Sequence, residues 1–149
     1  MSFLSGFSIG TDLSISIIQD QSGQIIVLEG RLTSQEESAD DILIKTQPID
    51  NGGLPDFQVL PDGWTGTLEW DRQNDVFSAY MAALELGRYQ GGLQVTHSIT
   101  STKRNVDGSV SRSQLLRALF HQYKPGTWTK TAAVKGRVNI IAQQRLQLQ

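Results

Sequence analysis

Alternation of apolar and polar residues is the feature that most restricts the fold of this chain. In residues 93–102, Leu93, Val95, His97 and Ile99 occupy every second position. The positions between them hold Gln94, Thr96, Ser98, Thr100 and Thr102. Because successive side chains of a β-strand point to opposite sides, this period of two predicts a strand with one buried face. The same alternation recurs in residues 13–17, 64–70 and 134–142.

Turn signals join these segments into hairpins. A Gln-Ser-Gly turn separates two β-branched runs within residues 12–30, and an Asp107-Gly108 turn divides residues 93–120. The period changes once, because Phe77, Tyr80, Met81 and Leu84 follow a helical spacing; this predicts a helix over 74–87, capped by Asn74 or Asp75 and ending near Gly87. We therefore expect a single, mainly β domain over 1–149. Its predicted form is a two-sheet antiparallel β-sandwich with one flanking α-helix.

Residues 31–62 break the regular pattern. They hold an acidic cluster (Glu36, Glu37, Asp40 and Asp41) and a tract rich in Pro, Gly and Asp from Pro48 onward. Long connections with little regular structure are commonly functional or disordered. Two interpretations stay open: a flexible surface excursion, or a loop that becomes ordered against a neighbouring subunit. The acidic cluster lacks the spacing of a calcium loop, and a solvated charged segment is the simpler interpretation.

Composition excludes several classes of protein. The chain of 149 residues has a net charge of −2, so it lacks the positive field that holds nucleic acid. It has no cysteine, which excludes disulfides and thiolate chemistry and suits a reducing compartment. No apolar run reaches the length of a membrane span, and the first residues lack the basic region of a signal peptide. We expect a soluble protein that does not insert into a membrane.

The residues needed for catalysis or metal binding are scarce. The only histidines, His97 and His121, are far apart in the sequence, and isolated imidazoles are usually structural. We predict no catalytic, cofactor-binding or metal-binding residue and no cofactor. The three tryptophans leave a carbohydrate-binding alternative open, since sugars stack on aromatic rings. Trp64 and Trp70 share the apolar face of one strand, where core packing is the default, whereas Trp128 follows a Lys-Pro-Gly turn.

Several strings from Gly63 onward resemble the subunits of bacteriophage tail tubes. These strings are GWTGTLEWDR, the helical NDVFSAYMAALELGRYQGG, a threonine-rich strand that ends in NVDGS, and a strand pair with KPGTW between its members. The resemblance covers about residues 63–146; residues 1–62 are similar in layout only.

The resemblance implies a structural virion protein rather than an enzyme. Six copies would join their inner sheets into one barrel within a hexameric ring, and rings would stack into the hollow tail tube that conducts phage DNA into the host. Partners would be further copies of the chain together with sheath, tape measure, baseplate and tail terminator proteins. DNA would pass transiently and without specific binding. The location would be the tail of the virion, that of a contractile-tailed phage, after assembly in the host bacterial cytoplasm.

Two alternatives belong to other classes. One is a carbohydrate-binding β-sandwich module of a tail fibre. The other is the tube protein of a related contractile secretion device.

The tube interpretation assigns candidate residues to two roles. A channel for DNA should be lined by groups that do not hold phosphate, which suits Gln94, Thr96, Ser98, Thr100 and Thr102. An ordinary solvated sheet face is the competing interpretation of these five residues. Contacts between subunits are expected from an N-terminal arm, residues 1–10, and from a long inter-ring loop, residues 31–62. Their candidate contact residues are Phe3, Leu4, Phe7, Ile9, Pro48, Leu54 and Phe57.

Overall fold

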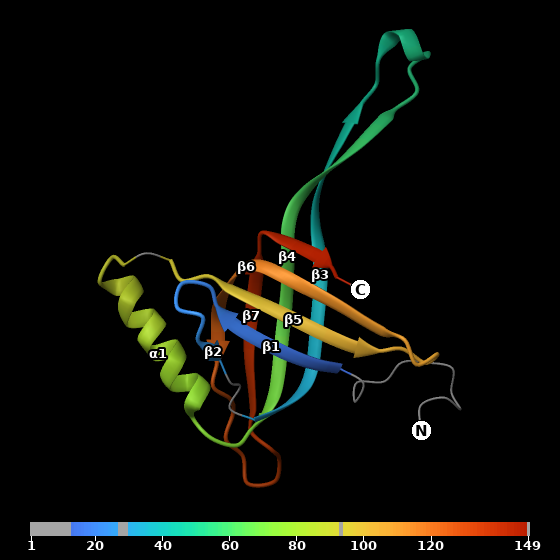
Figure 1. Cartoon of the computed structure of the whole chain (residues 1–149). Coiled ribbons are helices and arrows are strands. Elements are labelled where there is room, and N and C mark those ends of the chain that lie inside the picture. The colour runs from blue at the N-terminus through green and yellow to red at the C-terminus, as the bar shows by residue number, and fades with distance from the viewer. Residues whose placement is uncertain (1–12, 27–29, 93, 149) are drawn as a thin grey trace.

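The described part of the chain forms one antiparallel sheet with a helix at its side (Figure 1). The computed structural model describes residues 13–26, 30–92 and 94–148. The elements are β1 (Leu13–Gln19), β2 (Ile25–Ile26), β3 (Gly30–Thr46), a 3-10 turn (Ile49–Asn51), β4 (Asp56–Arg72), α1 (Val76–Tyr89), β5 (His97–Arg104), β6 (Val110–Lys124), β7 (Lys135–Ala142) and β8 (Gln144–Gln147). The strand order is β2-β1-β5-β6-β7-β4-β3, and β8 pairs with β6. The prediction of a mainly β, antiparallel fold with a helix is confirmed.

Strand β6 connects two halves of this sheet. Its first part pairs with β5 up to Ala118 and with β8, whereas its second part, from Leu119, pairs with β7. Positive φ angles at Arg117 (52°) and Gln122 (51°), with register shifts beside them, bend the strand. The strands therefore form one bent sheet of eight strands, and the predicted two-sheet sandwich is not confirmed.

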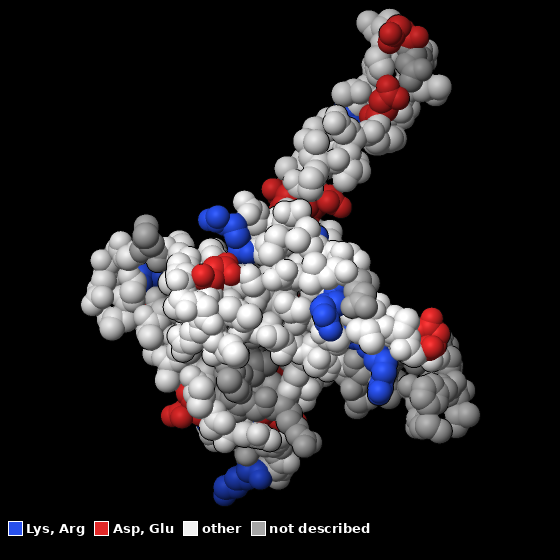
Figure 2. Space-filling model, in the orientation of Figure 1, with Lys and Arg blue, Asp and Glu red and all other residues white. Residues whose placement is uncertain are grey.

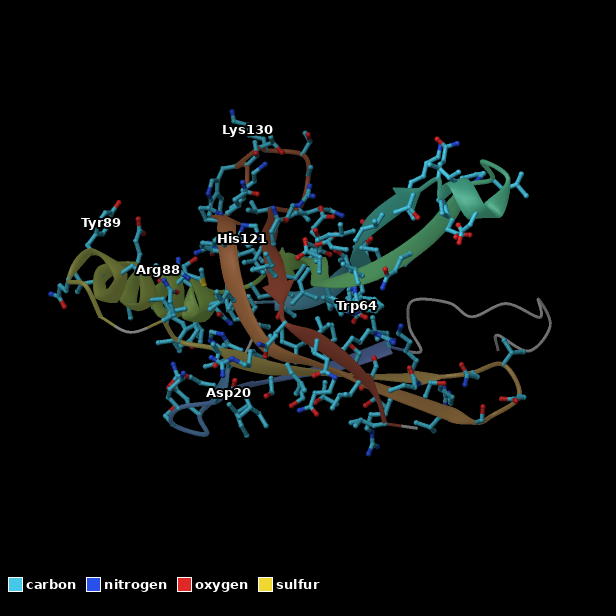
Figure 3. All side chains as sticks on the ribbon, turned by 90° about the horizontal axis from the view of Figure 1, so that it is seen from above. Asp20, Trp64, Arg88, Tyr89, His121 and Lys130 are labelled. Atoms are coloured by element: carbon cyan, nitrogen blue, oxygen red, sulfur yellow. The ribbon has the colours of Figure 1, made fainter. Side chains whose placement is uncertain are left out.

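We call the two parts the front half and the back half. The front half comprises β1, β2, β5, β8 and β6 up to Ala118; the back half comprises β3, β4, β7 and β6 from Leu119. The strands of the front half cross in front of those of the back half in Figure 1, and the view from above in Figure 3 separates the same two layers.

The core lies between the crossed halves and is closed by the helix. Buried residues come from both halves and from α1, in agreement with the alternation in the sequence. They include Ile17, Leu68, Trp70, Phe77, Met81, Ile99, Leu115, Phe120, Val138 and Ile140. The ring of Phe77 meets the rings of Trp70 and Phe120 edge to face, with centroids 5.2 and 5.5 Å apart. Helix α1 thus holds the two halves together through its aromatic side.

The helix differs from its prediction at both ends. It spans Val76–Tyr89 rather than 74–87. Asn74 provides the side-chain contact at its start, because its Oδ1 accepts a hydrogen bond from the backbone N–H of Val76 at 3.0 Å. The helix continues through Gly87 and ends before Gly91, whose φ of 73° suits a glycine at this position.

Residues 31–62 are not a loop. Strands β3 and β4 pair from Gly30 with Arg72 to Thr46 with Asp56, so this region is a long hairpin with a 3-10 turn at its tip. The prolines and aspartates, and a register shift between Ala39 and Asp41, interrupt the alternation from which a strand is read.

The outer part of this hairpin leaves the body of the protein. Strand β7 accompanies β4 only as far as the pair of Trp64 with Ala142. Residues 40–62, which we call the arm, therefore project as a two-stranded ribbon (Figure 1). At about 3.3 Å per residue, the strand from Asp56 to Gly63 alone reaches roughly 25 Å beyond the body.

Candidate functional site

The outer face of the front half carries most of the candidate lumen-lining residues. Directly opposed pairs share a face, and Ser14 opposes Thr102, Ser16 opposes Thr100 and Ile18 opposes Ser98. On the other side of β5, Thr102 opposes Arg112 and Thr100 opposes Gln114. These rows contain one charged side chain, that of Arg112. The predicted polar, nearly uncharged strand face is therefore real over Ser98–Thr102, while Gln94 and Thr96 precede the strand.

A carboxylate lies at one end of this face. Asp20 accepts hydrogen bonds from the hydroxyls of Ser98 (2.6 Å) and Thr96 (2.7 Å). Partial burial works to raise the pKa of the Asp20 carboxyl, but these two hydrogen bonds, together with the positive charge of Arg117, outweigh it and lower the pKa. The face therefore ends in a fixed negative charge. The cations of the β5–β6 hairpin, Lys103 and Arg104, lie at the opposite end of β5, beside the turn.

Among residues 13–26, 30–92 and 94–148, the two lateral strands of the front half, β1 and β8, are paired along their length on one side only. Strand β1 pairs with β5 along its whole length, but on its other side β2 covers only Ile17 and Ile18. Strand β8 pairs only with β6, through Ser113–Leu116. Within the described part of the chain, Leu13–Ser16 of β1 and Gln144–Leu146 of β8 thus form two short lateral edges to which a further strand could add.

An ion pair connects the edge strand β8 to the root of the arm. The Nε of Arg145 donates to the Glu37 carboxylate at 2.8 Å, and both side chains are largely buried. The Arg145 guanidinium also lies over the ring of Trp64, 5.2 Å from its centroid. Sequence reasoning placed Glu37 in a solvated acidic cluster, and it missed this contact because the partner lies 108 residues away.

His97 is a structural residue in the core. Its Nδ1 is 3.2 Å from the carbonyl oxygen of Ala118, which can only accept, so Nδ1 carries the proton. The hydroxyl of Tyr80 then donates to Nε2 at 2.5 Å and itself accepts from the Gln19 amide at 2.9 Å. Burial lowers the pKa of His97, so the ring is neutral. This chain of hydrogen bonds holds α1 against β1, β5 and β6.

The arrangement of polar groups does not favour catalysis. His121, the other histidine, lines an open hollow of about 350 Å³ on the outer face of the back half, together with Glu36, Arg137 and Asn139. Among residues 13–26, 30–92 and 94–148, the carboxylates and histidines form no group suited to a metal ion. In the same part of the chain, no helix is long and apolar enough to cross a membrane.

The tryptophans do not form the surface that the carbohydrate alternative requires. An exposed Trp64 or Trp70 beside Asp or Asn side chains would favour that alternative. Trp70 is fully buried, and Trp64 is partly buried beneath Arg145. Trp128 is the exposed one, at 70%, and the Arg72 guanidinium lies 5.1 Å from its ring centroid.

The arm exposes large apolar side chains. Two of the candidate contact residues, Leu54 and Phe57, are 65% and 60% exposed, and Pro48 is partly buried. Further exposed apolar residues of the arm are Ile42, Leu43, Ile44, Ile49, Val59 and Leu60. Monomeric proteins seldom expose such a continuous apolar surface. The other candidates, Phe3, Leu4, Phe7 and Ile9, lie outside the described residues.

Comparison with known proteins shows which solved structures share this fold. No known family model matches the sequence, and no curated protein sequence does either. Solved structures do match. A chain of the cap that terminates the tube of the anti-feeding prophage superimposes with a TM-score of 0.65 at 11% identity, over 95% of this chain and 91% of that one. The fold is that of tail tube and tube-terminator proteins.

Two further structures support the tail tube fold. A chain of the six-fold symmetrised anti-feeding prophage baseplate gives a TM-score of 0.62 at 10% identity, over 95% of both chains. A chain from the tail of an empty GTA particle, solved with C6 symmetry, gives 0.57 at 10% identity, over 96% of this chain and all of that one. These neighbours are structural components of tail-like particles rather than enzymes, in line with the prediction from the sequence.

Proposed function

We propose that this chain is the structural tube subunit of a tail-like particle, with six copies forming a ring and rings stacking into a hollow tube. The observation that carries the proposal is the front half: a polar, nearly uncharged outer face between β1 and β8, which are its two lateral strands among the described residues. The six-fold symmetry of two assemblies that contain this fold supports the choice of a hexamer.

In this ring the front halves of neighbouring copies form a continuous barrel. The edge of β1 at Leu13–Ser16 of one copy pairs with the edge of β8 at Gln144–Leu146 of the next, which satisfies backbone groups of edge strands that otherwise invite aggregation. The outer face of the front half becomes the wall of the lumen. Ser98, Thr100 and Thr102 then line the channel, with Thr96 and Gln94 at its end.

The character of this wall suits the passage of DNA. Neutral hydroxyl and amide groups bind phosphate weakly, and the Asp20 carboxylate repels it. We therefore propose a channel that conducts phage DNA without holding it. The alternative is the tube of a contractile injection device, favoured by two matching structures that come from an extracellular contractile injection system. Detection of nuclease-protected DNA inside isolated particles would favour the DNA channel over the injection device.

The same proposal assigns the remaining partners and the location. Baseplate and terminator proteins would cap the two ends of the tube, and a tape measure protein would occupy the lumen during assembly. A sheath would meet the exposed side of α1, where Val76, Leu86 and Tyr89 are more than half exposed. The location is the tail of the virion, after assembly in the host bacterial cytoplasm.

Stacking of rings is assigned to the arm and to the N-terminal segment, residues 1–10. The test is a variant in which an Asn-Gly turn between Ala39 and Trp64 replaces residues 40–63, since these two residues form a directly opposed pair. Rings without tubes are expected by electron microscopy, because the front half is intact. Tubes as long as those of the unmodified protein would contradict the stacking role.

A further inference from the structure

Charge is divided unevenly along this chain, although its net charge is only −2. Residues 1–75 hold 13 of the 15 acidic side chains and three of the 13 basic ones, whereas residues 76–149 hold two acidic and ten basic side chains. A uniform mixture would not produce opposite signs in the two parts of one small domain. Whether the acidic and basic side chains also lie on separate surfaces depends on the fold.

Part of the acidic excess lies in the arm. The arm holds five aspartates and a single basic residue, Lys45. Asp50 lies in the 3-10 turn at the tip, and Asp56 begins the returning strand. Figure 2 shows acidic side chains from the tip of the arm to its root. The same tip exposes Ile49, Leu54 and Phe57, so the arm presents an acidic and apolar surface.

The loop between β6 and β7, residues 125–134, lies at the opposite end of the molecule. Strand β4 runs from the arm to Arg72, and its last pairs with β7 include Asp71 opposite Lys135, where the loop joins β7. The loop is thus attached at the end of the β4–β7 ladder farthest from the arm, as Figure 1 shows. Figure 3 labels Lys130 at the outer end of this loop, with its side chain directed away from the body.

This loop carries the charge and apolar surface that complement the arm. Residues 124–135 contain Lys124, Lys130 and Lys135 and no acidic residue. The nearby carboxylates Asp71 and Glu69 stand directly opposite Lys135 and Arg137. Lys124 and Lys130 are exposed and have no such opposed carboxylate. Trp128 supplies an exposed aromatic surface between them.

We propose that the β6–β7 loop is the docking site for the arm tip of a second copy in the next ring. The inference rests on the proposed tube function and names the surface that the arm meets. Leu54 and Phe57 of one copy pack near Trp128 of the other, and the aspartates at the tip pair with Lys124 and Lys130. Burial of the apolar groups supplies most of the affinity, and the opposite charges supply orientation.

This arrangement sets the direction of stacking. Two arms that face each other bring acidic groups together, and two loops that face each other bring basic groups together, so both wrong orientations are disfavoured. Only arm against loop is complementary. Every ring in a tube therefore points the same way, and each ring keeps one unoccupied set of arms at one end of the tube.

A charge exchange between the two surfaces tests the proposal. The arm variant carries Asp50→Lys and Asp56→Lys, and the loop variant carries Lys124→Glu and Lys130→Glu; all four positions are exposed and outside the core. We expect each variant alone to form rings but no tubes in negative-stain microscopy. An equimolar mixture should regain tubes that contain both proteins, because a basic arm tip meets an acidic loop at one interface and the natural pair meets at the next. One chain with all four changes should also build tubes.

The control is Glu85→Lys on α1, an exposed change of the same charge away from both surfaces, and it should leave tube length unchanged. The proposal is overturned if either variant alone builds tubes of ordinary length, or if the mixture stays as rings. Absence of tubes from the unmodified protein would instead contradict the proposed function itself.

Discussion

Strand β4 passes through two environments, and their comparison explains the organisation of the molecule. In the body, Leu68 and Trp70 are 1% and 0% exposed, whereas in the arm Phe57 and Val59 are 60% and 59% exposed. One strand is therefore part of a packed core at one end and part of a bare ribbon at the other. Two-stranded ribbons gain little stability on their own. The exposed apolar residues of the arm add little to the packed core, which is why we propose that they contact another molecule.

The largest effect on folding is expected from Phe77→Ala. The Phe77 ring is fully buried and contacts the rings of Trp70, Phe120 and Tyr123, so its removal leaves a cavity where the helix meets both halves. We expect the free energy of unfolding to fall by about 3–5 kcal/mol, measured by chemical denaturation. A loss below about 1 kcal/mol would show that this contact does not hold the body together.

A smaller loss is expected from Gly136→Ala. A Cβ at Gly136 would lie 2.5 Å from atoms of the Trp70 ring, which is fully buried in the core. Overpacking of this kind costs roughly 1–3 kcal/mol. Gly87→Ala is the matched control, because a Cβ there meets no atom within 4 Å and alanine favours a helix. The control should be neutral or stabilising; equal losses at both sites would contradict the packing of Trp70.

The free energy of unfolding of the subunit should depend on pH through His97. Burial lowers the pKa of the folded histidine below its ordinary 6.5, so below about pH 6.5 the unfolded chain takes up a proton that the folded chain does not. The free energy of unfolding therefore falls with falling pH, by at most about 1.4 kcal/mol per pH unit from this group. Unfolding measured at pH 7 and pH 5 checks this, and His97→Gln should reduce the difference. His121→Gln serves as the control and should retain it.

The smallest effect on folding is expected in the arm. Phe57→Ala truncates a ring as large as that of Phe77, but one that is already 60% exposed. We expect the unfolding free energy of the subunit to change by no more than about 0.5 kcal/mol, while tube formation is strongly impaired. Denaturation and electron microscopy of the same preparation give both readings. A large loss of subunit stability would mean that the arm packs against its own body.

The sequence predicts the strands of the body well because each buries one face. Alternation identifies the hairpins and the polar face over Ser98–Thr102, and a helical spacing identifies α1. Alternation does not show which strands pair. The bend of β6 at Arg117 and Gln122, which joins the two predicted sheets into one, could therefore not be predicted from the sequence. The strands of the arm cannot be recognised in this way. Neither face of the arm is buried in the subunit, so its sequence lacks the alternation of apolar and polar residues that indicates a strand.

The candidate site, like the fold, could be predicted from the sequence only in part. The uncharged face follows from local alternation, whereas the pair of Glu37 with Arg145 joins residues 108 positions apart and depends on the crossed halves. The division of charge between the two parts of the chain could have been read from the sequence alone. The two parts of the chain carry charges of opposite sign that nearly cancel. The net charge of the whole chain therefore does not reveal this division.

Electron microscopy of the purified protein at increasing concentration tests the tube assignment most directly. The account predicts six-fold rings that stack into hollow tubes as the concentration rises, because open strand edges and a bare apolar arm are both covered only in the assembly. Monomers at every concentration, with neither rings nor tubes, would contradict it.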